Sequence, residues 1–220
     1  MGPASRPRIK ICCIKSLAEA RLAIDAGAGA LGLVGPMPSG PGVITDDVIA
    51  AIALSVPPPI ATFLLTSEQS VDGIVAHHRR ARTTAIQLVD RLTRGSYADL
   101  RRELPGIKIV QVVHVTGPES VDEAKALAAD VDALLLDSGR PDMPVKELGG
   151  TGRRHDWQIS RRMREEVAIP VFLAGGLNAG NVREAIEQVG PFGLDVCSGV
   201  RSGESLDPSR LLAFFKAAGF

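Results

Sequence analysis

The chain of 220 residues is 45% hydrophobic and 23% charged, which is ordinary for a globular protein. Its 25 basic and 25 acidic residues cancel, so the composition indicates no nucleic-acid or membrane-surface partner. No segment approaches the ~20 apolar residues of a membrane-spanning helix. The length is large for one simple core but suits a single α/β barrel.

The cysteines and the N-terminus indicate the compartment. There are three cysteines, two of them adjacent, and an odd number does not make a disulfide framework. Residues 1–7 lack the apolar segment of a signal peptide and are expected to be a disordered leader or a remnant of cloning. We therefore expect a reducing, cytoplasmic location and a single domain over residues 8–220.

Eight short apolar runs are predicted to be β-strands, with helix-periodic segments between them. Most of these runs are almost continuously apolar, as expected for parallel strands that are covered on both faces. In chain order they are residues 9–13, 30–34, 59–66, 84–89, 107–115, 133–137, 171–174 and 193–198.

Helix starts are marked by polar residues with known capping roles. Ser16 and Ser120 are each followed three residues later by a glutamate, which predicts two capping boxes. Asp207 precedes a proline at the first position of the last helix.

Eight strand–helix units leave little room for a second domain and predict a closed (β/α)₈ TIM barrel. The alternative is an open doubly wound sheet, which usually has a glycine-rich turn after its first strand. Residues 13–16 occupy that turn here and contain no glycine. The sequence therefore favours the barrel.

A thiol and a carboxyl are expected at the mouth of this barrel, where the strands end. Side chains alternate along a strand, so Lys10 and Cys12 are predicted to point inward and Cys13 outward. Asp137 ends the sixth strand on its inner face. Cys12 and Asp137 would then form an acid/base pair across one pocket. The structural alternatives are an inert buried cysteine and an aspartate that caps a turn.

Two glycine-rich turns follow the last two strands. Gly175 and Gly176 follow the seventh strand, and Ser198 and Gly199 follow the eighth. In barrels, backbone amides at this place often hold a phosphate, although glycines can also serve only to allow tight turns. The connection over residues 138–156 is longer than usual and contains a third glycine-rich segment, which suggests a lid or a substrate-gripping loop.

The four histidines do not gather at one place in the sequence. His77 and His78 are expected to be solvated at a helix end, whereas His114 could reach the pocket from the fifth strand. His155 lies in the long connection. No spacing resembles a metal site, and no cofactor is expected.

Taken together, these motifs resemble the phosphoribosylanthranilate isomerase family, a tryptophan-pathway barrel. The resemblance covers nearly the whole chain and preserves the family's order of motifs. Its parts are residues 10–12, 30–34, 87–88, 135–138, 149–152 with 156–157, 173–177 with 181–182, and 195–196 with 198–200.

The resemblance implies an Amadori rearrangement of a small phosphorylated sugar. Asp137 would be the general acid that opens the ribose ring, and Cys12 the general base that removes the proton at the sugar C2. Lys10 is the candidate cation beside the thiol, and a nearby cation favours a thiolate. Gly175, Gly176, Ser198 and Gly199 would hold the substrate phosphate. Further possible substrate contacts are Lys10, Gln87, His114 and Arg201.

The chain also departs from the family pattern. Cys13 stands where the family has glycine, and residues 39–42 lack the arginine that meets the anthranilate carboxylate in the family. The family's His-Gly after Gln-Leu is replaced by Val89 and Asp90. Cys197 stands where serine is usual, and Arg201 where glutamate is usual. The phosphate and acid/base parts are thus kept, while the part that faces the aromatic acid is altered.

Losing that arginine forfeits a charge-assisted contact of roughly 1.5–3 kcal/mol, for which Arg91, Arg140 or Arg201 could compensate. Two alternatives follow from the departures. One is a divergent paralogue that isomerises another phosphorylated sugar or aminosugar. The other is a non-catalytic barrel that binds a phosphorylated ligand, which the retention of Cys12 and Asp137 disfavours. The sequence does not predict an oligomeric state.

Overall fold

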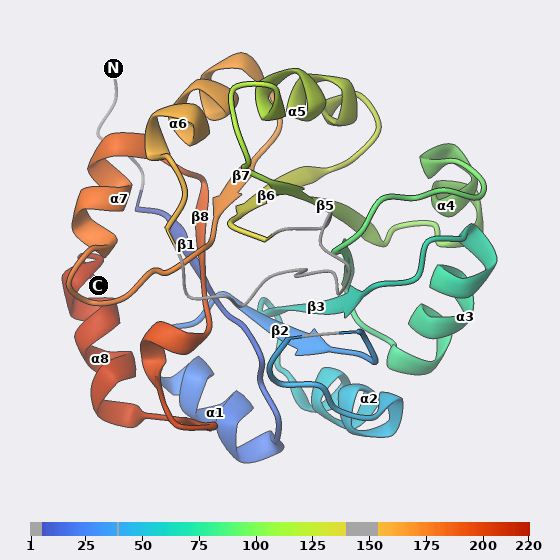
Figure 1. Cartoon of the computed structure of the whole chain (residues 1–220). Helices are drawn as coiled ribbons and strands as arrows, with labels where there is room; N and C mark the ends of the chain where they lie inside the picture. Colours follow the sequence, from blue (N-terminus) through green and yellow to red (C-terminus); the bar gives the residue numbers. More distant parts are fainter. Residues whose placement is uncertain (1–5, 39, 140–153) are drawn as a thin grey trace.

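The structure, a computed structural model, describes residues 6–38, 40–139 and 154–220. Eight parallel strands close into a barrel in which each strand pairs with its neighbours in chain order and β1 pairs with β8. Figure 1 shows the helices as an outer ring around this barrel. The predicted (β/α)₈ barrel is confirmed, and the open doubly wound sheet is excluded because the two edge strands pair.

The elements agree with the predicted order. The strands are β1 (Arg8–Ile11), β2 (Ala30–Val34), β3 (Ala61–Thr66), β4 (Ala85–Leu88), β5 (Lys108–His114), β6 (Ala133–Asp137), β7 (Val171–Leu173) and β8 (Gly193–Val196). The helices are α1 (Leu17–Asp25), α2 (Asp46–Ser55), α3 (Val71–Ala81), α4 (Tyr97–Glu103), α5 (Ser120–Ala128), α6 (Trp157–Glu166), α7 (Val182–Val189) and α8 (Pro208–Ala217). A short 3-10 turn, η1 (Ser198–Val200), and the small strands β9 (Arg201–Ser202) and β10 (Ser205–Leu206) lie between β8 and α8.

Two apolar layers hold the barrel together. Ile11, Leu31 and Leu64 belong to the larger cluster, which lies between the strands and the helices. The smaller cluster fills the barrel interior and includes Leu65 and Leu135. Neighbouring residues of one strand thus belong to different layers, because side chains alternate across a strand. This alternation presents one set of side chains from each strand to the barrel interior.

The predicted helix starts are partly confirmed. Ser16 caps α1 by accepting from the N–H of Glu19, and Asp207 caps α8. The predicted capping box at Ser16 is only half formed, because the Glu19 carboxylate accepts from the N–H of Lys15. The predicted capping box at Ser120 is wrong, because α5 begins one residue earlier than expected and has Glu119 at its cap. The Ser120 hydroxyl instead accepts from the Thr116 N–H and donates to the carbonyl of His114. It therefore fastens the β5–α5 connection rather than the helix end.

The prediction that His77 and His78 are solvated is wrong. Both side chains lie on the buried face of α3. His77 Nδ1 is 2.9 Å from the Thr66 hydroxyl of β3, and His78 Nε2 is 2.8 Å from the carbonyl of Thr83. Burial lowers the pKa of His77 despite the nearby Asp46, so this ring favours the neutral form.

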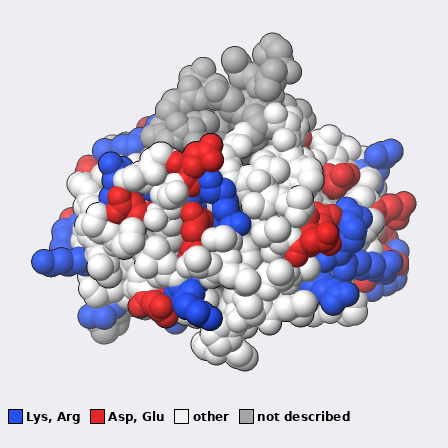
Figure 2. All heavy atoms as spheres, turned by 90° about the horizontal axis from the view of Figure 1, so that it is seen from below, with Lys and Arg blue, Asp and Glu red and all other residues white. Residues whose placement is uncertain are grey.

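The surface carries charges of both signs side by side. On the face that Figure 2 shows, blue basic groups and red acidic groups alternate rather than forming one large field of a single sign. Within the described residues, no helix has the length and apolar character needed to cross a membrane. Most of the predicted lid, including its glycine-rich segment at 149–152 and Arg140, lies outside the described residues.

Candidate active site

Three side chains from the paired strands β1 and β8 and from the residue that follows β1 meet inside the barrel mouth. Lys10 is fully buried, and its Nζ lies 2.8 Å from Oδ1 of Asp195 and 3.6 Å from Sγ of Cys12. Lys10 and Asp195 are direct partners in the β1–β8 register. Burial is the largest influence on the pKa of Lys10 and acts to lower it, but the charge and hydrogen bond of Asp195, together with the neighbouring Cys12 and Cys13, outweigh it and raise that pKa above its ordinary value. Lys10 is therefore a fixed cation beside the Cys12 thiol.

Asp137 ends β6 and is 8% exposed. Its Oδ1 accepts a hydrogen bond of 2.7 Å from the N–H of Ser138. Burial raises the pKa of this carboxyl above its usual range, although the Ser138 hydrogen bond and the charge of His114 oppose the shift. Asp195 and Lys10 also act on this carboxyl, so Asp137 belongs to the same electrostatic cluster as the β1–β8 side chains. A desolvated carboxyl that keeps its proton is suited to act as a general acid.

Asp195 is the member of this cluster that we did not predict as a functional residue. The signal was present in the sequence, because Asp195 is a single charged residue in an otherwise apolar strand. A buried carboxylate requires a partner, and Lys10 provides it. Pairing the two charges from the sequence would have required the β1–β8 register, which only barrel closure defines.

The prediction that Cys13 points outward is wrong. β1 ends at Ile11, and Cys13 has a φ of +62°, so the strand alternation does not extend to it. Its side chain packs in the cluster of the barrel interior. A left-handed backbone is costly for residues other than glycine, asparagine and aspartate, which gives a physical reason for the glycine of the family at this place.

The predicted phosphate loops lie against each other. Gly175 and Gly176 have positive φ angles of 83° and 65°. Asn178 and Asn181 both donate to the Gly176 carbonyl and fix this turn. A side-chain carbon at Gly199 would collide with the carbonyl of Leu177, so only glycine allows the loop after β8 to approach the loop after β7 this closely. The structure thus brings the four predicted phosphate residues, two from each loop, to one edge of the mouth.

The remaining predicted contacts fall into two groups. Gln87 and His114 lie inside the barrel mouth and are largely buried, and both Gln87 Oε1 and His114 Nδ1 have no hydrogen-bond partner within the described chain. Arg201 is instead engaged by the protein itself. Its guanidinium binds both carboxylate oxygens of Glu19, at 3.0 and 2.9 Å, as well as the carbonyls of Cys13 and Glu204.

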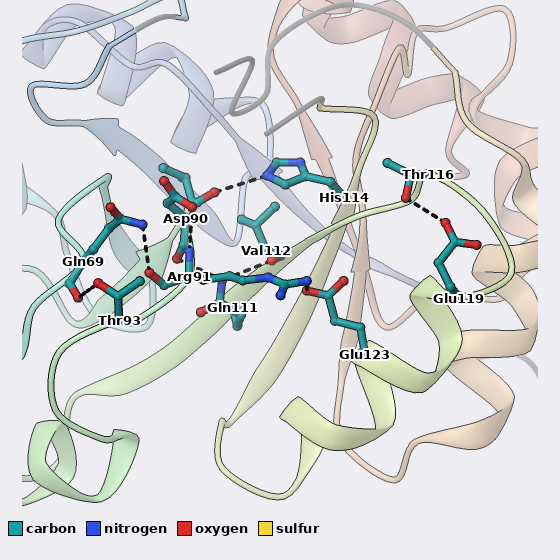
Figure 3. A pocket seen from close by; sticks show the side chains of 11 residues that line it. Gln69, Asp90, Arg91, Thr93, Gln111, Val112, His114, Thr116, Glu119 and Glu123 are labelled. Atoms are coloured by element: carbon teal, nitrogen blue, oxygen red, sulfur yellow. Dashed lines mark hydrogen bonds and ion pairs between the residues drawn. The ribbon is translucent and has the colours of Figure 1, made fainter. Parts of the chain in front are cut away.

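A pocket of about 650 Å³ opens between the ends of β4 and β5. Figure 3 shows Arg91 extending along it from the β4–α4 connection, with His114 on the side of the barrel mouth. Arg91 Nη2 is 2.8 Å from Oε1 of Glu123, and the arginine side chain is 74% exposed. The pocket therefore has an exposed positive charge, that of Arg91, next to the barrel mouth.

The fold and the position of these groups at the carboxyl ends of the strands define the class of protein. It is a (β/α)₈-barrel enzyme whose chemistry takes place at the barrel mouth. Among the described residues, no group of three or more His, Cys, Asp or Glu side chains has a geometry that could hold a metal ion.

Comparison with known proteins identifies the family. The family model for N-(5'-phosphoribosyl)anthranilate (PRA) isomerase matches residues 9–217. N-(5'-phosphoribosyl)anthranilate isomerase 2 of Methanosarcina mazei is 36% identical over 96% of this chain and 93% of its own length. The isomerase of Desulforudis audaxviator is 37% identical over 96% of this chain and 97% of its own length.

Solved structures agree with the sequence comparison. The phosphoribosylanthranilate isomerase of Thermotoga maritima has a TM-score of 0.80 at 27% identity, covering 96% of this chain and 98% of that chain. Another solved isomerase, in complex with reduced 1-(o-carboxyphenylamino)-1-deoxyribulose 5-phosphate, has a TM-score of 0.77 at 25% identity over 96% of this chain and 98% of its own. The chain belongs to the phosphoribosylanthranilate isomerase family and is an isomerase.

Proposed function

We propose that the chain converts N-(5'-phosphoribosyl)anthranilate to the corresponding aminodeoxyribulose phosphate, an aldose–ketose isomerisation of tryptophan biosynthesis. The observation that carries this proposal is the buried carboxyl of Asp137, whose pKa is raised by burial, in one mouth with the Cys12 thiol and its Lys10 neighbour. Family membership supports the same reaction. The reaction needs one proton donor and one proton acceptor, and the mouth offers one of each.

Asp137 is proposed to begin the reaction as general acid. Its proton passes to the ribose ring oxygen, the bond between that oxygen and the sugar C1 breaks, and the nitrogen lone pair forms the Schiff base. The resulting carboxylate stays close to Lys10 and His114, whose charges favour the ionised form. Burial thus favours the protonated acid before transfer, and the two positive neighbours reduce the cost of forming the carboxylate.

Cys12 is proposed to act next, as general base. Its sulfur removes the proton at the sugar C2, the electrons of that bond form the enolamine, and tautomerisation gives the ketone. Lys10 Nζ, at 3.6 Å from the sulfur and held by Asp195, is placed to stabilise a thiolate. A rigid cation is effective here because it does not have to reorganise during the reaction.

The phosphate of the substrate is proposed to bind at the two glycine loops. Gly175 and Gly176 after β7 and Ser198 and Gly199 after β8 present backbone groups where no side chain interferes. This edge of the mouth adjoins β1, so an anchored phosphate would leave the sugar carbons over Cys12. The anchor and the acid/base pair are then fixed by consecutive strands of the barrel.

The anthranilate carboxylate needs a positive group, and we propose Arg91. A side-chain carbon at Gly42, next to the family's Ser-Pro-Arg stretch, would lie only 2.5 Å from Cβ of Cys13, so an arginine does not fit there. Arg201 is occupied by Glu19, and Arg140 lies outside the described residues. Arg91 lines an open pocket, and its guanidinium forms an ion pair with Glu123 in which the arginine is exposed.

The proposal is tested by incubating the purified protein with N-(5'-phosphoribosyl)anthranilate and following the loss of its anthranilate fluorescence. Growth of a tryptophan auxotroph that lacks this step provides a second readout. The double variant Cys12→Ala/Asp137→Ala, purified in parallel, controls for a contaminating host isomerase. No conversion above this control at high enzyme concentration would overturn the proposal.

A second candidate is an isomerase of the same type whose N-substituent lacks a carboxylate. The observation in its favour is the contact of Gly42 with Cys13, which removes the family's carboxylate anchor. N-(5'-phosphoribosyl)aniline differs from the first substrate only in that carboxylate. A higher kcat/KM for the aniline compound would select the second candidate, and a preference for the anthranilate compound would select the first.

A further inference from the structure

Three positions at which this chain departs from its family meet in space at the exits of β1 and β8. Sγ of Cys13 and Sγ of Cys197 are 2.7 Å apart, although the two residues are 184 positions apart in the sequence. Gly42 packs against Cys13 so closely that any larger residue would collide with it. Ile11 and Val196 are the last partners in the β1–β8 register, so both thiols lie just beyond the paired strands.

The two thiols differ in accessibility. Cys13 is 4% exposed and packs in the interior cluster, whereas Cys197 is only partly buried. All three cysteines are free thiols in the structure. Cys197 is therefore the more accessible of the two thiols to a reagent from solution.

The thiols also differ in how readily they ionise. The hydrogen bond with Cys13 lowers the pKa of Cys197, and the positive charge of Arg201 acts in the same direction against burial. Hydrogen bonds with Cys12 and with Cys197, together with burial, raise the pKa of Cys13. Cys197 thus has the character of an attacking thiolate and Cys13 that of a resolving thiol.

We propose that Cys13 and Cys197 are a redox-active dithiol, which a low-molecular-weight disulfide such as oxidised glutathione converts into a disulfide between the β1 and β8 exits. The two sulfurs already lie 2.7 Å apart, close to the ~2.05 Å of a disulfide bond. We expect Cys12 to keep its thiol although Cys13 also hydrogen-bonds to it, because the 2.7 Å sulfur contact of Cys13 is with Cys197 and the Cys12 sulfur lies beside Lys10 and Gly32.

The reaction is ordinary thiol–disulfide exchange. The Cys197 thiolate attacks one sulfur of oxidised glutathione, the glutathione disulfide breaks, and one reduced glutathione leaves. The Cys13 thiol then loses its proton and attacks the Cys197 sulfur, which releases the second reduced glutathione. The protein loses two electrons and two hydrogens, and oxidised glutathione gains both.

The disulfide changes the surroundings of the proposed base. The Cys13 thiol hydrogen-bonds to Cys12, and oxidation removes this donor. We expect kcat to fall about tenfold, the lower end of the loss for one hydrogen bond to a charged group. The effect should reverse with dithiothreitol. This activity readout depends on the proposed function, whereas the covalent change does not.

The test is to incubate the whole protein with excess oxidised glutathione and measure its intact mass under denaturing conditions. We expect a loss of about two mass units, a cross-linked peptide that joins Cys13 to Cys197, and full alkylation of Cys12. A stable glutathione adduct without the cross-link, a cross-link that includes Cys12, or no change in mass would each overturn the proposal. A normal mass change with no loss of activity would overturn only the effect on Cys12.

Two matched variants complete the test. Cys197→Ser keeps a hydrogen-bonding side chain of similar size, and we expect it to retain the activity of the reduced protein and to resist the oxidant. Cys13→Gly suits the left-handed backbone at this position, so it tests the pair even if the first variant fails to fold. Each variant should accept at most one glutathione at the remaining thiol of the pair. An internal disulfide in either variant contradicts the assignment.

Discussion

The two sides of the barrel mouth differ in how their charges are held. On the side of β1 and β8, Lys10 and Asp195 form an ion pair whose side chains are 0% and 7% exposed. On the side of β4 and β5, Arg91 and Glu123 form a pair whose side chains are 74% and 28% exposed. On the first side Lys10, Cys12 and Asp195 keep the family pattern, although Cys13 and Cys197 beside them depart from it. On the second side Val89 and Asp90 replace the family's His-Gly. Acid/base catalysis is favoured by charges that are held in place in a site without water. Recognition of the substrate's N-substituent depends instead on exposed groups, which can be replaced with little effect on the stability of the fold.

The largest contrast is expected in stability. Lys10→Met leaves the Asp195 carboxylate buried without its partner and should lower the free energy of unfolding by about 3–5 kcal/mol. Urea unfolding followed by circular dichroism measures the change. The double variant Lys10→Met/Asp195→Leu removes both charges and should recover most of the loss. A free energy of unfolding of Lys10→Met within about 1 kcal/mol of the wild-type value would show that an unpaired Asp195 costs less than its burial implies.

The next effect concerns catalysis, which combines Cys12 on the first side with Asp137 at the end of β6. Cys12→Ala and Asp137→Ala should each lower kcat by a hundredfold or more, since general acid and base contributions are usually ~10²–10⁴. Steady-state kinetics with N-(5'-phosphoribosyl)anthranilate measures this loss, and unchanged circular dichroism spectra control for folding. KM should change much less, because neither side chain belongs to the proposed phosphate loops. Full activity in either variant refutes the role assigned to that residue.

The raised pKa of Asp137 gives these kinetics a definite pH dependence. Burial is the main cause of the shift, so the carboxyl holds its proton at pH values where an exposed aspartic acid has ionised. A general acid works only while protonated. The kcat should therefore fall as pH rises through this pKa, by about tenfold per pH unit above it. Measuring kcat between about pH 5 and about pH 9 tests whether it falls as the pH rises. Asp137→Asn should lack this descending limb, and a limb that survives in the variant must belong to another group.

The sequence predicted the barrel well because each strand–helix unit carries its own signal. All eight strands occur in the predicted order, and Cys12 and Asp137 occupy the strand exits where alternation placed them. The predictions that were wrong or missing depend on contacts with other parts of the fold. The outward prediction for Cys13 assumed that β1 continues, but its left-handed backbone turns the side chain inward. Asp195 becomes a site residue only when barrel closure pairs it with Lys10.

The histidines of α3 also show that local sequence alone does not predict which polar side chains are buried. His77 and His78 sit beside two arginines in the sequence, which suggested a solvated helix end. Their burial follows from the rotation of α3 against β3, where the Thr66 hydroxyl meets the ring of His77. A buried polar side chain is predictable only together with its partner, and this partner lies in another element.

The smallest expected effect tests the altered side of the mouth. Arg91→Ala removes an exposed ion pair, so the free energy of unfolding should change by less than about 1 kcal/mol. If Arg91 contacts the substrate carboxylate, KM for N-(5'-phosphoribosyl)anthranilate should rise roughly threefold to tenfold while kcat stays within about twofold. The same variant should leave KM for N-(5'-phosphoribosyl)aniline unchanged, because that compound has no carboxylate.

Two controls sharpen this last test. Glu123→Ala removes the acidic partner and frees Arg91, so KM for the anthranilate compound should stay the same or fall. Arg102→Ala removes an equally exposed arginine that is paired with Asp99 on α4 and lines no part of this pocket, so it should change neither constant. An Arg91→Ala variant that behaves like Arg102→Ala would mean that the pocket between β4 and β5 does not recognise the carboxylate. Recognition of the substrate carboxylate would then require a different cation, and the β4–β5 side would not be the recognition side of the mouth.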